Sequence, residues 1–403
     1  MMFKNYYCFI GFLKIAILIL VTLSSKVFID GCIVPNVDQN KVEVKCYTIQ
    51  TVTTGVSRAG SAAVSKLVED SCFQDVGAIV IRCKIGFENK NSKGEDAVLN
   101  TCKNGKWKYE NTTSDDCESI CGKLFKEELK PTTTPLLYKG NEVDIRVAPW
   151  HVAVYKNNSY KFDQICGGTI IHSNIVVSAA HCFYDEAYGK LYDSSNFWIG
   201  AGKRYRQYEA EEQLSQFARI NHIYLPPTFQ AQPLRSDIAA LKLDRHFTYS
   251  PVIAPVCLDW NLNLIYGSYN GIIGHLYGWG DTSSKGVPSE KLLKLDLITI
   301  PNDYCRDKID RNFRSDVSGD RFCAINEENG TACGGDSGSG LITYRQGYKL
   351  SGVVSAGLNR NNYCTDGFVT LFTNVRIFQD FLKTVVSNSR DEEQDLETFL
   401  SLY

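Results

Sequence analysis

The feature that most constrains this 403-residue chain is the run TACGGDSGSGL at residues 331–341. Glycines on both sides of Ser337 let the backbone turn sharply, so that a serine hydroxyl can stand in the open with backbone amides beside it. The amides of Gly335 and Ser337 can then point at one developing oxyanion, and each such donor is worth roughly 10²–10³ in rate. The run therefore indicates a nucleophilic serine beside its own oxyanion hole.

Two other strings supply the partners that a nucleophilic serine needs. Residues 178–182 read SAAHC, which puts His181 beside a cysteine, and residues 236–241 read SDIAAL, which puts Asp237 at the head of an apolar run. The chain order His181, Asp237, Ser337 and the neighbours of each residue resemble the chymotrypsin-like serine proteases. The resemblance spans residues 137–387, the part expected to form the protease domain.

The resemblance implies a role for each of the three residues. Ser337 would attack the scissile carbonyl, His181 would act as general base and acid, and Asp237 would orient the imidazole. It also implies an all-β fold of two six-stranded antiparallel barrels, with the site between them and a C-terminal helix. Apolar runs at 175–177, 241–243, 341–344 and 353–354 are typical of strands, and helical spacing of apolar residues predicts a helix over 375–386. We expect no cofactor and no metal.

The N-terminal residues 1–25 have the features of a secretory signal. Lys4 precedes an apolar stretch that Lys14 interrupts, and the uninterrupted part is too short to span a bilayer. Its removal would take Cys8 away and leave fourteen of the fifteen cysteines, which we expect to be paired outside the cell. Sequons at Asn111 and Asn157 fit glycosylation there. A net charge of −2 offers no basic surface, so we expect no nucleic-acid partner.

The resemblance implies disulfides as well. Within the protease-like part it pairs Cys166–Cys182, Cys305–Cys323 and Cys333–Cys364. Cys257 then has no partner in that part. In multidomain relatives the cysteine at this place reaches back to the propiece, where Cys121 is the candidate, and the N-terminal part would stay attached after activation.

Six further cysteines lie close together in residues 32–120, a density that indicates a disulfide-held module. The run from Cys83 to Cys117 resembles the second half of a complement-control (sushi) module, which predicts a Cys83–Cys117 pair. The pairing of Cys32, Cys46, Cys72 and Cys102 stays open. A zinc site is the competing interpretation, but no CxxC spacing or nearby histidine supports it. Small modules of this kind bind other proteins, so we expect an adaptor, here for an upstream recognition protein.

Residues 121–136 form a charged, then Pro/Thr-rich linker that ends in an activation segment. Chymotrypsin-type zymogens are activated by a cut that frees an apolar N-terminus, whose ammonium pairs with the aspartate before the serine, here Asp336. Counting back from Pro149-Trp150 in the family's pattern places the cut between Leu136 and Leu137. Most of the family has Arg or Lys before the cut. The activator is therefore expected to prefer Leu, and one candidate is the protein itself.

The resemblance also places the primary specificity pocket. Its floor would be Thr331, where a trypsin-like enzyme holds an aspartate, and its walls would be Ser355, Gly357 and Thr370. Burying a substrate Arg without a counter-charge costs several kcal/mol, so trypsin-like cleavage is disfavoured. Thr370 would narrow the pocket, which predicts a preference for medium or small apolar side chains. Ala356 and Ser339-Gly340 replace residues usual in the family, which predicts low general activity.

Taken together, the module, the Leu cut site and the uncharged pocket resemble the modular serine proteases that initiate arthropod immune cascades. This narrower resemblance implies a secreted zymogen whose protein substrate is a downstream protease zymogen of a Toll or prophenoloxidase pathway. The alternative from another class is a catalytically weak or silent protease-like scaffold of such a cascade. A digestive protease is a further alternative, although such enzymes rarely retain an adaptor module. Residues 388–403 are an acidic tail that we expect to be solvated.

Overall fold

The computed structural model describes the strands within residues 42–119 and, beyond them, residues 120–124, 140–158, 161–259, 270–281, 286–309, 311–317, 319–328, 330–357 and 369–389. The chain divides into two compact units, Met1–Ser119 and Ile120–Tyr403. The expected signal segment, the bond between Leu136 and Leu137 and the acidic tail lie outside the described residues. The predicted domain boundaries therefore stay predictions.

The described residues of the first unit form β-strands. Five of them make one antiparallel sheet in the order β2-β1-β3-β5-β6, and the other two, β4 and β7, pair with each other. Their bounds are β1 Val42–Thr53, β2 Ala63–Asp70, β3 Ala78–Cys83, β4 Phe87–Asn89, β5 Ala97–Lys103, β6 Lys106–Trp107 and β7 Cys117–Ser119. The side chains of Cys83 and Cys117 are outside the described set, so the sushi-like assignment and this disulfide remain predictions.

The first barrel of the second unit is a closed antiparallel sheet in the order β10-β11-β16-β15-β14-β9. Its strands are β9 His151–Asn157, β10 Phe162–His172, β11 Ile175–Ser178, β14 Phe197–Ala201, β15 Gln216–Tyr224 and β16 Ala239–Leu243. All four residues of β11 are buried, as the β-branched run Ile175-Val176-Val177 favours. In the pairing of β11 with β16, Ser178 lies opposite Ala239. The segments that carry His181 and Asp237 therefore leave the barrel at the same end.

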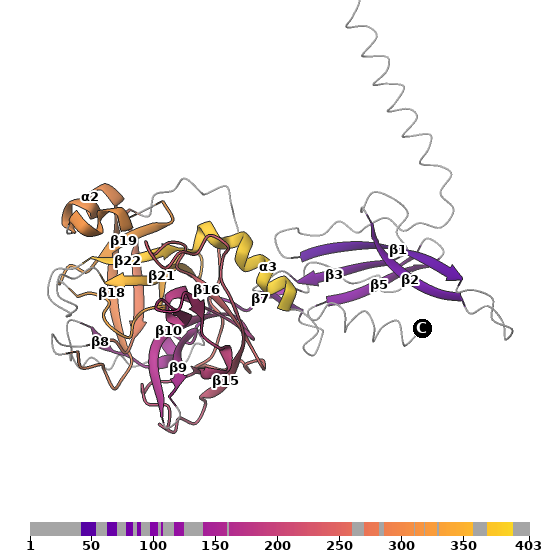
Figure 1. Ribbon diagram of the computed structural model, residues 1–403. Helices are drawn as coiled ribbons and strands as arrows, with labels where there is room; N and C mark the ends of the chain where they lie inside the picture. The colour runs from indigo at the N-terminus through magenta and orange to yellow at the C-terminus, as the bar shows by residue number, and fades with distance from the viewer. Residues whose placement is uncertain are drawn as a thin grey trace, which may run out of the picture. The chain divides into compact units, whose positions relative to one another are not determined.

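The second barrel runs β17-β20-β21-β22-β19-β18, and it closes because β17 also pairs with β18. Its strands are β17 Ile273–Gly278, β18 Leu293–Ile300, β19 Arg321–Ile325, β20 Gly340–Tyr344, β21 Tyr348–Gly357 and β22 Thr370–Asn374, and β8 Asn141–Glu142 adds to the edge at β18. Inside lies an apolar core that includes Leu297, Leu341 and Phe372, all fully buried. Figure 1 shows these strands in orange and yellow beside the magenta strands of the first barrel. The all-β fold of two six-stranded barrels is confirmed.

The helix predicted over 375–386 is present, but its first turn is different. Val375–Phe378 form a 3₁₀ turn (η7), with the Asn374 side chain accepting a hydrogen bond from the Arg376 amide, and α3 follows as Gln379–Ser389. The spacing of apolar residues over a single turn cannot distinguish a 3₁₀-helix, with 3.0 residues per turn, from an α-helix, with 3.6. The other helices are short: α2 Asn302–Lys308, η2 Ile145–Val147, η3 Ala180–Phe183, η4 Ser194–Asn196 and η6 Arg311–Asp316. A small hairpin, β12 Tyr184–Asp185 with β13 Lys190–Leu191, follows η3.

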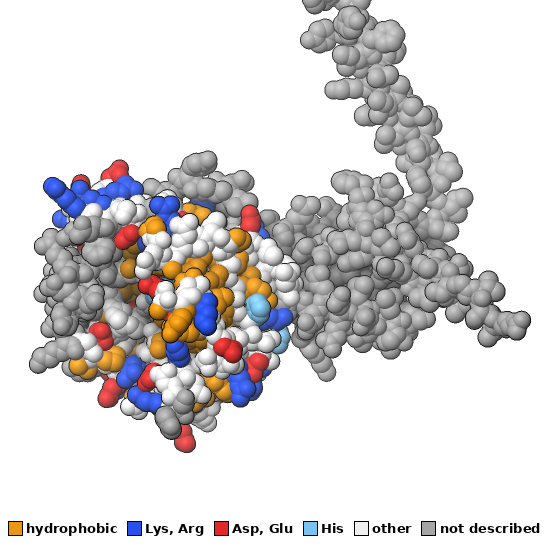
Figure 2. Space-filling view, viewed as in Figure 1, with side chains coloured by type: hydrophobic (Ala, Val, Ile, Leu, Met, Phe, Trp, Pro, Cys, Tyr) orange, Lys and Arg blue, Asp and Glu red, His pale blue; other side chains and the backbone are white. Residues whose placement is uncertain are grey.

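The surface of the second unit has both signs of charge. In Figure 2, Lys and Arg side chains alternate with Asp and Glu around an apolar area in the middle of the visible face. This mixture agrees with the small net charge of −2. None of the helices in the described part of the chain has the length and apolar character needed to cross a bilayer.

Candidate active site

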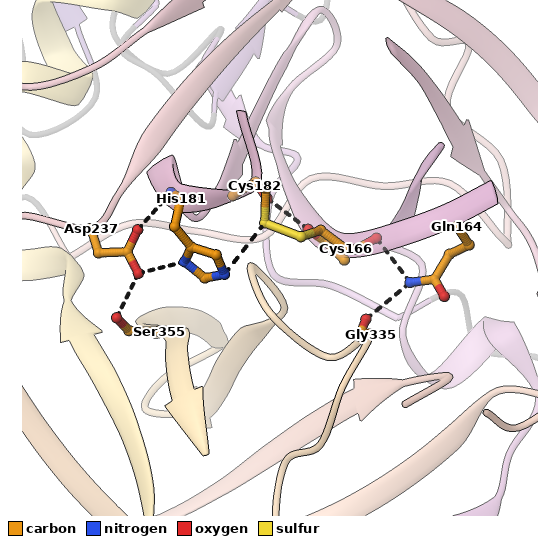
Figure 3. The surroundings of a disulfide bond; sticks show 9 residues. Gln164, Cys166, His181, Cys182, Asp237, Gly335 and Ser355 are labelled. Atoms are coloured by element: carbon orange, nitrogen blue, oxygen red, sulfur yellow. Dashed lines mark hydrogen bonds and ion pairs between the residues drawn. A yellow bond between two sulfur atoms is a disulfide. The ribbon is translucent and has the colours of Figure 1, made fainter. Parts of the chain in front are cut away.

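His181 and Asp237 are joined by two hydrogen bonds at the open end of the first barrel. His181 lies in η3, just after β11, and Asp237 lies just before β16. The His181 Nδ1 atom is 2.8 Å from Asp237 Oδ2, and the His181 amide donates to Asp237 Oδ1 at 2.9 Å. Figure 3 shows the imidazole between this carboxylate and the Cys166–Cys182 disulfide. Both contacts fix the ring, with Nε2 left to face a reacting group.

Burial and charge act in opposite directions on this pair. Asp237 is fully buried, which alone would raise the pKa of its carboxyl, but His181 and the Ser355 hydroxyl outweigh burial and lower that pKa. Burial alone would lower the pKa of His181, whereas the charge and hydrogen bond of Asp237 raise it above its ordinary value. Asp237 therefore stays ionised at neutral pH and stabilises a proton on the imidazole.

The serine loop, residues 333–338, comes from the second barrel and packs against the segment that leads into His181. Gly338 has φ of +81°, and a Cβ built on it would meet Ser178 Oγ at 2.2 Å and the Gly167 carbonyl oxygen at 2.5 Å. Only glycine fits such a close approach. The Gly167 amide in turn donates to the Ser337 carbonyl at 2.8 Å. Ser337 is thus brought to the end of the first barrel that holds His181 and Asp237.

Ser337 Oγ forms no hydrogen bond with His181 in the described part of the chain. The atom recorded near His181 Nε2 is Cys182 Sγ, at 3.9 Å. Hydrogen bonds between a nucleophile and its base are commonly long or absent without substrate, and they tighten in the substrate complex. The serine and histidine come from segments that pack together, as the Gly167–Ser337 hydrogen bond shows.

A residue that the sequence patterns did not single out, Gln164, holds the oxyanion side of the serine loop. Its side-chain Nε2 donates to the carbonyl oxygens of Cys166 and Gly335, each at 3.0 Å. Gly335 has φ of +92°, a conformation that glycine adopts readily. The Gln164 side chain therefore orients the peptide group between Gly335 and Asp336. This peptide group lies between the amides of Gly335 and Ser337, which are predicted to form the oxyanion hole. Figure 3 shows this bridge.

Asp336 points away from the serine, into the second barrel. Its carboxylate accepts hydrogen bonds from the Gly280 amide at 2.8 Å and the Cys333 amide at 3.0 Å. A Cβ built on Gly280 would meet Asp336 Oδ2 at 2.1 Å, so this position requires glycine. Burial raises the pKa of Asp336 to about 6. The hydrogen bonds from the two amides lower this pKa, and the nearby Asp281 raises it further. The site predicted to receive a new N-terminus therefore holds a carboxyl group that is costly to ionise.

Three of the residues predicted to line the specificity pocket, Thr331, Ser355 and Thr370, are buried and uncharged. Thr331 Oγ1 and Thr370 Oγ1 are 3.2 Å apart, and Thr370 Oγ1 also accepts the Ala332 amide at 3.1 Å. Thr370 pairs with Gly357, the last residue of β21. Ser355, predicted as a wall, also donates its hydroxyl to Asp237 Oδ2 at 2.5 Å. It thus contacts the triad, a role that the sequence pattern alone did not indicate.

Two substituted positions near the serine differ in how they are accommodated. Ala356 is partly buried against an apolar cluster of the second barrel. The Ser339 hydroxyl is fully buried and has no hydrogen-bond partner among the described residues. A buried hydroxyl without a partner costs about 1–3 kcal/mol. Of the two substitutions, the structure shows a cost only for Ser339.

Three of the five predicted disulfides are present: Cys166–Cys182, Cys305–Cys323 and Cys121–Cys257. Cys333 is also disulfide-bonded, while its predicted partner Cys364 lies outside the described residues. Cys166, His181 and Cys182 bring possible metal ligands within 4.8 Å of one another. Both sulfurs are taken up by the disulfide and supply no thiolate, so these three residues do not make a zinc site. Asn157 is exposed, and Asn111 lies outside the described residues.

Two closed antiparallel barrels, a histidine hydrogen-bonded to a buried aspartate and a serine in a glycine-rich loop define the class of trypsin-fold serine endopeptidases. The chain belongs to the trypsin family, whose family model matches residues 137–382.

Curated relatives extend the similarity beyond the protease part. The chain is 28% identical over 324 residues to "Modular serine protease" of Drosophila melanogaster. This alignment covers 76% of this chain and 48% of the relative. It is 26% identical over 265 residues to "Clotting factor C" of Tachypleus tridentatus. That alignment covers 63% of this chain and 25% of the relative. The chain thus spans less than half the length of either relative.

Proposed function

We propose that this chain is the zymogen of a secreted serine endopeptidase that cleaves proteins after medium or small apolar residues. The observation that carries the proposal is the hydrogen-bonded pair of His181 and Asp237 at the place where the serine loop packs on the first barrel. The two barrels each contribute a part of the triad, and neither part is complete alone. A substrate bound between them would align Ser337 with His181 Nε2.

The chemistry follows from these positions. His181 Nε2 takes the proton of the Ser337 hydroxyl as the oxygen attacks the scissile carbonyl, and Asp237 stabilises the imidazolium that forms. The amides of Gly335 and Ser337 receive the negative charge of the tetrahedral intermediate. His181 then passes its proton to the leaving amine, and water hydrolyses the acyl-enzyme by the same steps.

Specificity is proposed to follow from the pocket floor. Thr331 and Thr370 present hydroxyl groups that are already hydrogen-bonded, and neither residue carries a charge. A substrate Arg or Lys would be buried there without a counter-charge, at a cost of several kcal/mol. A Leu or Val side chain needs no polar partner, so apolar residues are favoured.

Activation is proposed to occur by cleavage between Leu136 and Leu137. Among the described residues no cation forms an ion pair with Asp336, and burial raises the pKa of this carboxyl to about 6. The ammonium of a new N-terminus at Leu137 would supply the missing charge and stabilise the serine loop in its active form. The Cys121–Cys257 disulfide would keep the segment before the cut covalently attached.

The physiological role is proposed from the relatives named above. One of them is called a modular serine protease and the other a clotting factor. We propose that this chain acts early in an extracellular immune cascade of the Toll or prophenoloxidase type. Its substrate would be a downstream protease zymogen, and its N-terminal module, if sushi-like, would contact an upstream recognition protein.

The experiment that tests this function compares the purified proenzyme with its Ser337→Ala variant. We expect a new N-terminus at Leu137 in the wild type alone, together with labelling of Ser337 by an active-site phosphonate. The same cut in neither protein would point to a separate activator. A cut after Lys or Arg would overturn the activation model.

A catalytically weak scaffold is the second candidate, and the unpaired buried Ser339 hydroxyl is the observation that favours it. If protein cut at the Leu136–Leu137 bond with an added protease takes up no phosphonate, the scaffold replaces the enzyme. The variant Ser339→Gly, which removes the unpaired hydroxyl, separates the two cases, because it raises activity only if the triad is functional.

A further inference from the structure

Arg321, at the start of β19, carries a buried positive charge close to Asp237 and His181. The proposed reaction does not use this charge. Arg321 is only 2% exposed, and a guanidinium keeps its proton at any ordinary pH. In the described part of the chain Arg321 forms no ion pair within 4 Å. A charge buried in this way is costly unless something compensates it, so its contacts need an explanation.

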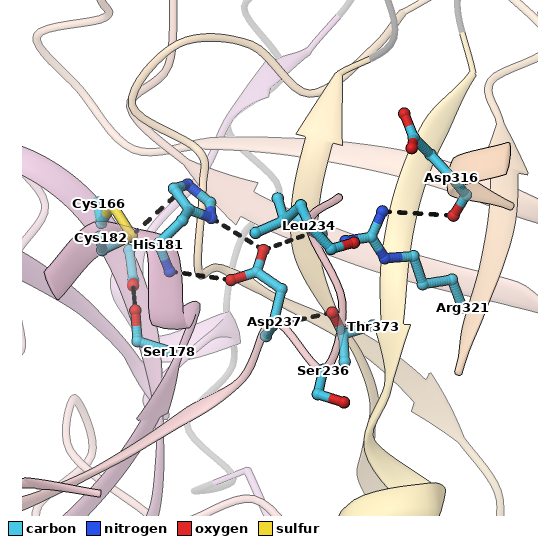
Figure 4. A network of polar contacts seen from close by, with 12 residues as sticks. Cys166, Ser178, His181, Cys182, Leu234, Ser236, Asp237, Asp316, Arg321 and Thr373 are labelled. Carbon is cyan, nitrogen blue, oxygen red and sulfur yellow. Dashed lines mark hydrogen bonds and ion pairs between the residues drawn. A yellow bond between two sulfur atoms is a disulfide. The ribbon is translucent and has the colours of Figure 1, made fainter. Parts of the chain in front are cut away.

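The contacts of Arg321 reach the loop that carries Asp237. One guanidinium nitrogen donates to the Leu234 carbonyl, and the other donates to the Asp316 carbonyl at 3.3 Å. Figure 4 shows the side chain extending between these two carbonyls, on the side of Asp237 away from His181. Leu234 lies three residues before Asp237 and belongs to the connection into the first barrel, whereas Arg321 belongs to the second.

Two neighbours of Arg321 hold the next residues of the same loop. The Asp320 carboxylate accepts the Ser236 amide at 2.7 Å, and the Thr373 hydroxyl, opposite Arg321 in the β19–β22 pairing, donates to the Asp237 carbonyl at 2.9 Å. Ser236 has φ of +49°, a left-handed conformation that a serine adopts only when its surroundings hold it. The second barrel thus fixes the backbone at Leu234, Ser236 and Asp237.

We propose that Arg321 is a positioning residue for the triad, which clamps the 234–237 loop across the two barrels and places a fixed positive charge behind the Asp237–His181 pair. This inference rests on the proposed function. Its first consequence is geometric, since the Asp237 carboxylate is held from the backbone side as well as by His181 and Ser355. Its second consequence is electrostatic and concerns the protonation of the general base.

The charges around His181 act in both directions. Asp237 and Glu186 raise the pKa of His181, whereas Arg321 lowers it. Around Arg321 itself, burial lowers the pKa of the guanidinium, Arg235 acts in the same direction, and Asp237, Asp320 and Asp316 oppose them. Arg321 therefore keeps more of the imidazole neutral at a given pH, which is the form that accepts the serine proton.

The test uses the activated, full-length enzyme with Arg321→Met and Arg321→Lys. For Arg321→Met we expect kcat to fall about tenfold and the acid limb of the kcat/KM profile to move up by roughly half a pH unit, because one positive charge near the imidazole is removed. For Arg321→Lys we expect a similar fall in kcat, since the two-pronged contact is lost, with the acid limb close to that of the wild type.

A matched control is Arg306→Met. Arg306 holds the Val317 carbonyl at 2.8 Å and is paired with Asp303, and it is not among the main influences on the pKa of His181, whereas Arg321 is. We expect its acid limb to be unchanged. Phosphonate titration counts the active sites in every preparation, so that misfolded protein does not enter the rates.

A second readout does not depend on turnover. In the Ser337→Ala background, the pKa of His181 is followed by NMR with and without Arg321→Met, and an increase is expected. An unchanged acid limb together with an unchanged His181 pKa would overturn the inference while leaving the proposed function intact. Absence of phosphonate labelling in the wild type would instead remove the proposed function.

Discussion

The buried carboxyl of Asp336 makes the stability of the uncleaved chain depend on pH. Its pKa of about 6 in the folded protein compares with an ordinary value of 3.8. Because the folded-state value is the higher one, the unfolded chain releases this proton first as pH rises. The contribution to stability is fully present below about pH 3.8 and is lost as pH rises through 6.

The size of the effect follows from that difference. Two pKa units correspond to about 3 kcal/mol, of which roughly 2 kcal/mol would be lost between pH 4 and pH 7. The Asp336→Asn variant cannot ionise. Its amide loses one of the two hydrogen bonds that the carboxylate accepts from Gly280 and Cys333, but this penalty does not change with pH.

The assay is urea unfolding followed by tryptophan fluorescence, at pH values from 4 to 8, on uncleaved protein carrying Ser337→Ala to prevent self-cleavage. The quantity to plot is the free energy of unfolding of the protein that retains Asp336 minus that of its Asp336→Asn variant. We expect this difference to fall by about 2 kcal/mol between pH 4 and pH 7. In protein cut at Leu136–Leu137 the fall should disappear, because the new ammonium lowers the pKa of Asp336. A difference that stays flat in the uncleaved protein would refute the reasoning.

Three further predictions concern other contacts. Gln164→Leu should lower kcat about tenfold with little change in KM, since its amide orients the oxyanion side of the serine loop; steady-state kinetics on a Leu peptide substrate checks this. Thr331→Asp should lower cleavage after Leu and raise the ratio of Arg to Leu cleavage at least tenfold, because the new carboxylate supplies a counter-charge for Arg. Matched peptide anilides measure this ratio, and an unchanged ratio would mean that Thr331 is not the pocket floor. Glu212→Gln should lower the free energy of unfolding by about 3 kcal/mol, because the fully buried Lys203 has its Nζ atom 3.2 Å from Glu212 Oε1. The control Glu211→Gln changes an exposed residue and should cost less than about 0.5 kcal/mol.

Local strings were enough to predict the fold and to single out three candidate triad residues, of which the structure joins His181 and Asp237 by hydrogen bonds. Each of His181, Asp237 and Ser337 lies in a run whose neighbours are informative, and Gly338, directly after Ser337, is required by the close approach of Ser178 and Gly167. The family resemblance that these strings carry also implied the disulfide between Cys166 and Cys182, which the structure contains.

The supporting contacts could not be predicted in the same way. Gln164 and Gly335 are 171 positions apart, and Arg321 and Leu234 are 87 positions apart. A lone Gln or Arg has no local pattern that announces such a partner, because the contact exists only after the two barrels have closed and packed together. The buried position of Lys203 is hidden for the same reason, since a lysine in a polar loop is normally exposed.

The disulfide between Cys121 and Cys257 also bears on where the proposed protease would act after activation. A single cut anywhere between these two cysteines leaves both fragments linked, so the proposed activation changes the chemistry of the molecule without releasing it. If the N-terminal part is bound to a surface, the active protease stays on that surface. Its encounters with substrates bound nearby then depend on their spacing over that area, and dilution into the surrounding fluid has little influence on the rate.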